Sequence, residues 1–553
     1  MRNCSPPQHL ARLLILAALL ALIAPCCPGA AQVRFIYVDG AYQGPEEGSP
    51  ERPYSTIAAA LAVAQAGDLI RVARGPQAVY AERLHITKPV TLQGGYNAAN
   101  WERDLVARDT VLDGQGEGPV VTIGPWADPG AQAVLEGFTI TNGSAAQGAG
   151  ILVEGASPVI RHNRISGNWA TGQGGGILVR DGSPTIRDNV METNTAERGG
   201  GICLIRSDAL IAGNWIMSNS GGQGGGISIE QGSRPRLENN TIIANEARDG
   251  AGMHVSSGSQ AEMVNQVLFM NHATQQGGGL GVDSASARVV HASILYNLAG
   301  QGGGVAAWGD GTAVTLTNSL VWGHGGDDLA GPHITASHSN VEQELLLGPG
   351  NLSADPRLAD PQRFDFHLLP DSPLVDAGVA VSSIREDFEG HDRWFDGDGD
   401  GVIAADIGAD EVAADPRDLA LRIVAAHSFP VPGGTLRYAI SATNLGQVDA
   451  PAATLTVTLP PGLAVQGETL TASLGAWRFE GAGLVWRGPL PVGERLDLAF
   501  RAGISDALPV DTVLTSAIEL AFGAQETLQR QAIAFVVAKR EAALPLLLKG
   551  FSP

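Results

Sequence analysis

One stretch of the sequence has residue types and a spacing that predict metal chemistry. It reads "DGDGDGVIAAD" and begins at residue 396. Asp396, Asp398 and Asp400 stand at alternate positions, so their carboxylates can turn toward one point. Gly401 permits a sharp bend, and the carbonyl of Val402 can supply a further oxygen. Hard oxygen ligands in this order are typical of the first half of a Ca²⁺-binding loop.

The second half of the expected loop is less regular. Loops of the EF-hand kind place their last carboxylate at the twelfth residue, and that residue here is Ile407. Asp406 stands one place earlier, and no flanking helices are evident. We therefore predict a structural Ca²⁺ site with Asp406 as a further ligand. A solvated acidic turn is the alternative.

A second stretch raises the question of hydrolysis. "GHGGDD" at residues 323–328 places His324 beside Asp327 and Asp328, and it is similar to polygalacturonase signatures. In that family the paired aspartates and the histidine come from different coils, whereas here they are sequence neighbours. Inverting hydrolysis needs two carboxylates that face each other across the sugar. We expect a solvated turn here.

Lyase chemistry would need clustered aspartates for Ca²⁺ and an arginine base on a neighbouring coil. Arg161 and Arg187 hold the same place, each two residues before a turn asparagine. The next two coils have Ala212 and Glu238 there, so the row breaks. We expect outward-facing charges on a solvated flank, and we assign no catalytic or cofactor-binding residue.

Tryptophan is the residue type here that could recognise sugar rings. Trp169 and Trp215 stand near asparagine turns, and Trp308 stands in another coil. An exposed row of such side chains could stack on saccharides. Packing of loops over the protein is the alternative.

These residues must be positioned by a repeat. Glycines before an apolar residue recur, three of them in "QGGGILV" at 173–179, with steps of 26, 25, 25, 26, 27 and 25 residues. The apolar residues are Ile151, Ile177, Ile202, Ile227, Met253, Leu280 and Val305. A pattern [I/L/M]-x-x-N keeps the same period, at Asn168, Asn194, Asn219, Asn245, Asn271 and Asn297. Further asparagines stand five residues earlier, at Asn163, Asn189, Asn214 and Asn240, and are replaced by Gln266 and Ala292 later in the array.

A period near 25 with short β runs predicts one coil of a right-handed parallel β-helix. We expect three strands and a loop per coil, the loop being "TNTAER" in the coil of residues 174–198. Ile, Leu and Val should point inward and stack on neighbouring coils. Turn asparagines can adopt left-handed backbone and bond the next coil. The glycines should shape a corner, because neither lysine nor helix follows them as a phosphate loop requires.

The repeats resemble those of polymorphic outer membrane proteins over residues 140–325. "PYSTIAAA" and "GDLIRV" in residues 33–125 resemble the start of pectin-lyase-like β-helix proteins, and a short helix between Tyr54 and Ala66 should plug the open end.

The marks "DFHL", "DSPLVDAG" and "DIGADE" in residues 352–412 resemble the choice-of-anchor Q segment of bacterial surface proteins. "YAISATNLG" and "LVWRGPLPVG" resemble a conserved-repeat surface domain, for which the strand lengths predict a seven-stranded sandwich.

The net charge of the chain and residues 1–31 indicate which partners are excluded and where the protein is located. A formal net charge of −22 argues against nucleic acid and anionic membranes as partners. Residues 1–31 have a basic start, an apolar stretch and small residues at the end, which predicts a secretory signal cleaved near Ala31. A lipoprotein signal at Cys26 is the alternative. Cleavage at Ala31 leaves Cys203, which we expect to be a buried apolar residue without a disulfide partner.

The sequence thus predicts an all-β protein, a right-handed parallel β-helix followed by an Ig-like β-sandwich. We expect a signal peptide at 1–31, a capped β-helix at 32–350, a choice-of-anchor Q-like segment at 351–412, a sandwich at 418–540 and a tail at 541–553. The tail is either a sorting or docking element or a frayed strand.

The expected function is extracellular binding without catalysis, at the cell surface or in the medium. The partners would be polysaccharide or cell-envelope components, with no transmembrane span in the mature chain. The alternative is a polysaccharide lyase or glycoside hydrolase of the pectin-lyase-like superfamily. A structural spacer is a third possibility.

Overall fold

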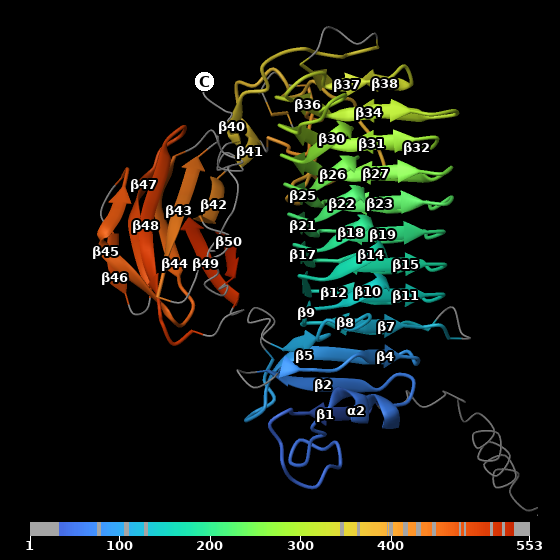
Figure 1. Ribbon diagram of the computed structural model, residues 1–553. Coiled ribbons are helices and arrows are strands. Elements are labelled where there is room, and N and C mark those ends of the chain that lie inside the picture. The colour runs from blue at the N-terminus through green and yellow to red at the C-terminus, as the bar shows by residue number, and fades with distance from the viewer. Residues whose placement is uncertain are drawn as a thin grey trace, which may run out of the picture.

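The computed structural model shows a solenoid of parallel strands with an antiparallel sandwich beside it (Figure 1). The predicted signal peptide and C-terminal tail lie outside the described residues. The structure describes residues 33–535 except 75–78, 104–109, 127–130, 343–347, 362–364, 395, 398–401, 413–418, 427–432, 445–448, 475–476, 481–482, 509–512 and 523–525.

Within these residues the solenoid has four parallel sheets, which we name A to D and which have 12, 11, 10 and 6 strands. Sheet A contains β1 (Phe35–Val38), β2 (Leu69–Arg74), β5 (Thr91–Asn97), β8 (Val134–Glu136), β12 (Val159–Arg161), β16 (Thr185–Arg187), β20 (Leu210–Ala212), β24 (Arg236–Glu238), β28 (Gln260–Val264), β32 (Ser286–Val290), β35 (Ala313–Thr317) and β38 (Ile334–Ser337). Sheet B contains β3 (Val79–Tyr80), β6 (Val111–Asp113), β9 (Thr139–Thr141), β13 (Arg164–Ser166), β17 (Val190–Glu192), β21 (Trp215–Met217), β25 (Thr241–Ile243), β29 (Val267–Phe269), β33 (Ser293–Leu295), β36 (Leu320–Trp322) and β39 (Asn340–Val341).

Sheets C and D meet at the glycine corners. Sheet C contains β4 (Leu84–Ile86), β7 (Val121–Ile123), β11 (Ile151–Glu154), β15 (Ile177–Arg180), β19 (Ile202–Ile205), β23 (Ile227–Glu230), β27 (Met253–Ser256), β31 (Leu280–Asp283), β34 (Val305–Trp308) and β37 (Leu329–Ala330). Sheet D contains β10 (Ser144–Gln147), β14 (Trp169–Gln173), β18 (Thr195–Arg198), β22 (Ser220–Gln223), β26 (Glu246–Asp249) and β30 (His272–Gln276).

Sheet D corrects the expectation of three strands per coil. Residues 195–198, expected as part of a loop, form β18, which pairs in parallel with β22. The asparagine turn before this segment and the glycine corner after it hold both ends at the spacing of paired strands, so the backbone between them pairs as well.

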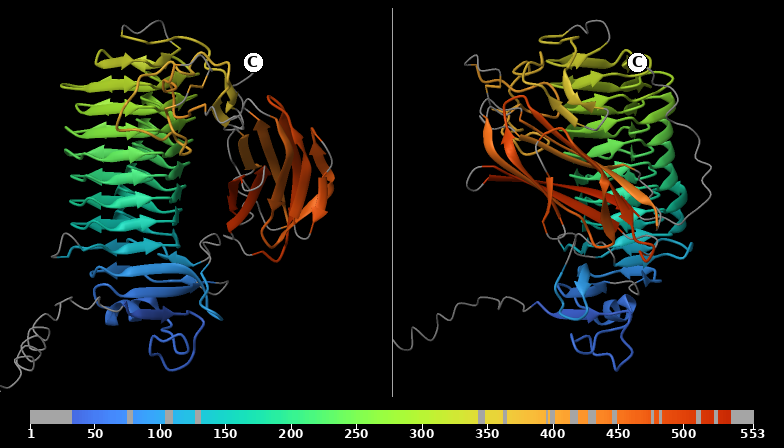
Figure 2. Two further views of the ribbon diagram at one scale, coloured as in Figure 1. Left: turned by 180° about the vertical axis from the view of Figure 1, so that it is seen from behind. Right: turned by 90° about the vertical axis from the view of Figure 1, so that its left-hand side faces the viewer.

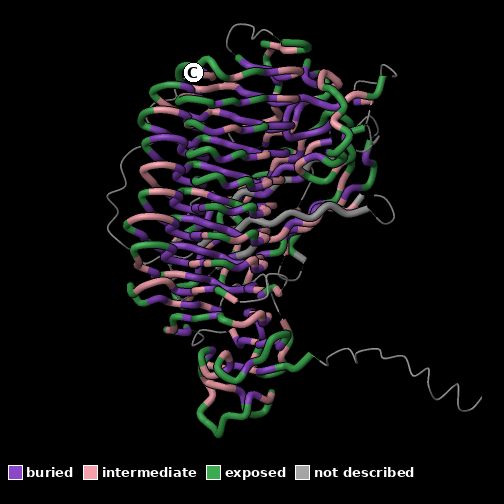
Figure 3. Tube along the Cα trace, turned by 90° about the vertical axis from the view of Figure 1, so that its right-hand side faces the viewer, coloured by how far each residue is buried: buried purple, intermediate pink, exposed green. Residues whose placement is uncertain are grey.

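Inward side chains stack on their equivalents one coil away. In sheet A, Ile160, Ile186, Ile211 and Leu237 are partners in register, and each is fully buried. Figure 3 shows the buried positions recurring along every coil of the array. Burying a side chain of this size contributes about 1.5–3 kcal/mol, but only a neighbouring coil can cover it. The predicted apolar columns are therefore confirmed.

Buried asparagines form two ladders, one at each end of sheet B. In the first, the Asn189 Oδ1 accepts the backbone N–H of Asn163 at 3.0 Å, and its Nδ2 donates to the carbonyl of Ile160 at 2.9 Å. The bonds to neighbouring coils are as expected. Left-handed backbone falls on the residue before each ladder asparagine, such as Asp188 (φ 57°) and Thr193 (φ 52°).

The glycine triplets form the corner between sheets D and C. Gly174 has φ 66°, which L side chains rarely adopt. A Cβ on Gly176 would stand 2.5 Å from the carbonyl oxygen of Gly201 in the next coil. The triplet therefore provides a left-handed turn and close approach of successive backbones, as predicted.

A short helix covers the first coils. Helix α2 (Ile57–Val63) begins at Thr56, whose side chain accepts the backbone N–H of Ala59. The Glu82 carboxylate accepts two further backbone N–H groups of the first turn, and Ile57 and Ala60 enter the solenoid core. The predicted plug is confirmed. Among the residues that the structure describes, no helix is both long and apolar enough to cross a membrane.

The segment after the solenoid packs on the outer face of sheet B. It contains one hairpin, β40 (Leu358–Asp360) with β41 (Asp365–Leu368). Leu374 and Ile407 pack with Phe269, Leu295 and Leu320 in a separate apolar cluster. This segment therefore depends on the solenoid for its own core.

The sandwich has a 4-stranded and a 5-stranded antiparallel sheet in the described residues, and not seven strands as expected. Its strands are β42 (Leu419–Ala426), β43 (Thr435–Asn444), β44 (Ala450–Thr458), β45 (Leu463–Ala472), β46 (Trp477–Glu480), β47 (Gly483–Leu490), β48 (Arg495–Ile504), β49 (Val513–Phe522) and β50 (Glu526–Phe535). The extra strands arise because turns divide long β runs, as between β47 and β48. The sandwich lies to one side of the solenoid (Figure 2), and Arg495 forms an ion pair of 3.4 Å with Asp360 of the hairpin.

Candidate functional site

The predicted calcium ligands fall into three groups. Asp398 and Asp400 lie outside the described residues. Val402 is exposed and Asp396 partly buried. Asp406 is fully buried, and its two oxygens accept the backbone N–H groups of Asp376 and Val412, each at 2.7 Å. Among the described residues, no three His, Cys, Asp or Glu side chains gather as a metal site requires. The Ca²⁺ loop stays a prediction.

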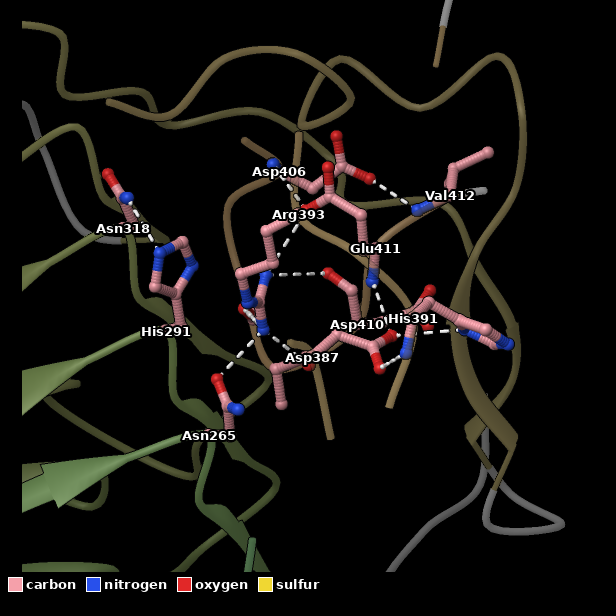
Figure 4. Close-up of polar contacts among 12 residues, drawn as sticks. Asn265, His291, Asn318, Asp387, His391, Arg393, Asp406, Asp410, Glu411 and Val412 are labelled. Atoms are coloured by element: carbon pink, nitrogen blue, oxygen red, sulfur yellow. Dashed lines mark hydrogen bonds and ion pairs between the residues drawn. The ribbon is translucent and has the colours of Figure 1, made fainter. Parts of the chain in front are cut away.

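A buried ionic clasp, centred on Arg393, joins this segment to the solenoid (Figure 4). The Arg393 guanidinium forms an ion pair of 3.2 Å with Glu411 and donates to the Asn265 Oδ1 at 2.9 Å. Nearby, the Asp387 carboxylate accepts the backbone N–H groups of His391 and Glu411. The sequence analysis did not assign these residues, because Asn265 and Arg393 are far apart in sequence.

Two acidic residues of the mark "DIGADE" hold backbone groups near the clasp. Asp406 and Asp410, both in "DIGADE", accept backbone N–H groups, Asp410 from Leu368 at 2.8 Å. Burial raises the pKa values of both carboxyl groups, because removal from water disfavours the charged form. Their contacts hold backbone in place, so these residues serve the fold of the segment.

His324 is part of the second asparagine ladder, so the expected solvated turn is wrong for this residue and for Asp328, which is buried, whereas Gly325, Gly326 and Asp327 are exposed. Its Nδ1 accepts the backbone N–H of Asn297 at 2.9 Å, and its Nε2 lies 3.1 Å from the carbonyl oxygen of Ile294. Burial lowers the pKa of His324 to about 4, so the ring is neutral and both nitrogens are in use. It is not available as a catalytic base.

The two arginines are placed as expected. Arg161 and Arg187 are partners in register on sheet A, and Ala212 follows in the next coil. Arg161 forms an ion pair with Glu136, and Arg187 forms one of 2.7 Å with Asp188.

The exposed tryptophans do not form one row. Trp169 begins β14 of sheet D and is 51% exposed, whereas Trp215 begins β21 of sheet B and is 48% exposed. They follow different ladders, so they stand at different corners. A continuous stacking platform from these two residues is excluded.

An open hollow of about 410 Å³ lies beside the third tryptophan, Trp308, which ends β34. Amide side chains of two successive coils, Gln276 and Gln301, line it together with Asp310 and His333. The indole lies close over Gly281, where a Cβ would stand 2.9 Å from it. An aromatic face with amides and one carboxylate is the chemistry of saccharide binding. We take this hollow as the candidate site.

A buried histidine lies under the indole. The rings of His254 and Trp308 are 5.8 Å apart, and His254 is 1% exposed. Within the described residues neither of its ring nitrogens has a hydrogen-bond partner. Burial lowers its pKa, so the imidazole is neutral. Its place in the glycine-triplet strand gave no chemical signal in the sequence.

One comparison with known proteins agrees with the coiled geometry. Residues 121–268 match the family model described as "Right handed beta helix region". No curated protein matches the chain. Among solved structures, pectate lyase Pel9A has 14% identity and a TM-score of 0.46, over 70% of this chain and 98% of its own.

Two other solved structures match smaller parts. ACE19, the collagen-binding subdomain of the Enterococcus faecalis surface protein ACE, has 9% identity and a TM-score of 0.16, over 21% of this chain and 95% of its own. BcpA, the major pilin subunit of Bacillus cereus, has 13% identity and a TM-score of 0.17, over 22% of this chain and 39% of its own.

Proposed function

We propose that this protein is a secreted, non-catalytic β-helix that binds extracellular polysaccharide in the hollow beside Trp308. The observation that carries the proposal is that Trp308, Gln276, Gln301 and Asp310 line one open hollow. Sugar rings stack on aromatic faces, and amides donate to and accept from hydroxyl groups. The hollow is open, as binding to the middle of a polymer requires.

The lining of the hollow supports binding without hydrolysis. Asp310 is the one carboxylate among the described residues that line it. Hydrolysis of a glycosidic bond needs two carboxyl groups at a defined separation. Binding without turnover is the function that this lining supports.

A surface location is part of the proposal. The signal-like residues 1–31 support export, and the choice-of-anchor Q-like marks in residues 352–412 support attachment to a cell envelope. Protease treatment of intact cells tests this: the protein should be degraded from outside, and its survival would refute a surface location.

The binding experiment uses the full chain with a panel of neutral polysaccharides in calorimetric titrations. Trp308→Ala should weaken binding about tenfold, and Gln301→Ala should weaken it without disturbing the packing on His254. Trp215→Ala is the matched control, because this indole is exposed at another corner. Equal affinity of the Trp308 and Trp215 variants would refute the site, and lack of binding to any glycan would favour a spacer.

A lyase or hydrolase is the second candidate, and His254 is the observation that favours it. A neutral imidazole without a partner is competent to accept a proton. It is enclosed beneath Trp308, so substrate would reach it only after the indole moved. Incubation with the same panel tests this, reading reducing ends and unsaturated products. Turnover that His254→Ala abolishes would replace the binding proposal.

A further inference from the structure

A cluster of aromatic rings surrounds one arginine on the outer face of sheet A, near the N-terminal end of the solenoid. The Arg71 Cζ lies 4.3 Å from the ring centre of Phe35, 5.6 Å from that of Tyr37 and 5.3 Å from that of Tyr96. Trp101 packs edge-on against Tyr37, with ring centres 4.7 Å apart. Aromatic residues are 5% of the sequence, so this gathering is unusual for the chain.

The register of sheet A explains why these side chains meet. Tyr37, Arg71 and Gln93 are partners on β1, β2 and β5, and Glu136 on β8 continues the same column. Side chains in one column project from the same face of a sheet. Phe35 stands two residues before Tyr37 and therefore projects from this face too.

Within the described residues, no Asp or Glu oxygen lies within ion-pair distance of Arg71, and its Nε has no hydrogen-bond partner. Its Nη1 donates to the Tyr37 hydroxyl at 3.4 Å. The nearest carboxylate of the column, Glu136, is shared by Arg103 and Arg161.

In the described part of this face, three arginines (Arg71, Arg103 and Arg161) accompany one glutamate of the column, Glu136, in a chain with a net charge of −22. The rings also leave apolar surface in contact with solvent, since Phe35 is 43% exposed. Guanidinium groups bind carboxylate and sulfate in a planar, two-pronged manner, and aromatic faces stack on sugar rings.

We infer that this cluster is a second binding site, specific for an anionic polysaccharide whose carboxylate or sulfate groups pair with Arg71 while a sugar ring stacks on Phe35 or Trp101. The site is separate from the hollow at Trp308, which has a carboxylate in its lining and for which we propose a neutral sugar. The two sites lie toward opposite ends of the solenoid, as the positions of β2 and β34 in Figure 1 show. One long polymer could therefore contact both.

The test compares polymers with one backbone and different charge. The full chain is titrated with dextran, carboxymethyl dextran and dextran sulfate at low salt. We expect at least tenfold tighter binding of a charged dextran than of dextran, weakened by added salt. The carboxymethyl and sulfate arms identify the preferred anion. Equal affinity for dextran and both charged polymers would overturn the inference.

Variants separate this site from simple charge attraction. Arg71→Ala should lower affinity for the charged polymer at least tenfold, and Arg71→Lys should restore only part of it, because lysine lacks the planar group. Arg288→Ala is the matched control: this arginine also lies on sheet A but is paired with Glu262. Equal loss in the Arg71 and Arg288 variants would overturn the proposal.

Three further measurements test the stacking contact, the saccharide specificity and the independence of the two sites. Phe35→Ala removes an exposed ring, so it should fold normally and still lose affinity several-fold; unchanged affinity would refute the stacking contact. Polyglutamate, a polyanion without sugar rings, should compete poorly, and competition equal to that of the charged dextran would refute saccharide specificity. The ratio of the affinities for charged and neutral dextran should fall in Arg71→Ala and should not fall in Trp308→Ala, so failure of one site is distinguishable from failure of the other.

Discussion

The Nδ1 atom of His324 accepts the backbone N–H of Asn297 at 2.9 Å, in the place that an asparagine Oδ1 holds in the preceding coils. The imidazole thus ends a ladder that begins with Asn168. Two predictions concern this residue.

Replacing His324 with alanine should leave the Asn297 N–H and the Ile294 carbonyl without their partners. We expect a loss of about 1–3 kcal/mol in the free energy of unfolding, whereas His324→Asn should retain most of it. Urea unfolding measures the total, and hydrogen exchange at the Asn297 amide localises it. Equal stability of the two variants would show that the ring merely fills space.

The same histidine should make stability depend on pH. Its pKa is about 4 in the folded state against an ordinary value of 6.5, so the unfolded chain binds a proton that the folded chain does not. Stability should therefore fall as pH drops from 6.5 toward 4, by up to about 3 kcal/mol. The thermal midpoint of the wild-type protein relative to His324→Asn isolates this contribution from the titration of the carboxylates. A constant difference across that range would contradict the assignment.

Gly176→Ala should be strongly destabilising. The added Cβ would stand 2.5 Å from the carbonyl oxygen of Gly201, so two coils would have to separate locally. We expect a cost above about 2 kcal/mol in urea unfolding. Gly467→Ala is the control, since its Cβ would meet nothing within 4 Å and its backbone is not left-handed. A similar small loss of unfolding free energy at both positions would mean that the glycine corner can rearrange to accept a Cβ.

The ionic clasp should respond asymmetrically to substitution. Arg393→Met leaves the buried Glu411 carboxylate without its cation and should cost about 3–5 kcal/mol. The double variant Arg393→Met, Glu411→Gln should recover part of that cost. Limited proteolysis within residues 352–412 reports detachment of the segment. Additive losses of unfolding free energy in the double variant would argue that Arg393 and Glu411 are not coupled.

The aspartate loop should stabilise the segment when Ca²⁺ is present. At a hundredfold excess over the dissociation constant, binding would add about 2.7 kcal/mol, seen as a higher thermal midpoint. Asp400→Asn should abolish the increase, and Mg²⁺ at equal concentration should not reproduce it. No shift with Ca²⁺ would favour the solvated acidic turn.

The repeating part of the fold could be predicted because its contacts are periodic. The step of about 26 residues places Ile160 beneath Ile186 and Asn163 beneath Asn189 without further information. A fourth strand per coil could not be predicted from "TAER", because that segment pairs only through backbone groups held by the corners on either side.

The sites were harder to predict because they depend on non-periodic contacts. Arg393 meets Asn265 across 128 residues of chain, and no spacing rule relates the two. The hollow beside Trp308 depends on Gly281, which leaves room for the indole one coil away. The neighbours of His324, "GG" and "DD", indicate a loop, whereas its distance of 27 residues from Asn297 continues the ladder.

The ladders and glycine corners repeat the same bonds at every coil, so the length of the rod is set by the number of coils alone. Adding or deleting one coil would change the distance between the end covered by helix α2 and the end joined by the Arg393 clasp by about 4.8 Å. The contacts at each end would stay the same. The length of the solenoid therefore changes in fixed steps of one coil. Gene duplications in units of one coil could tune how far the two ends stand apart while every bond at each end stays as it is.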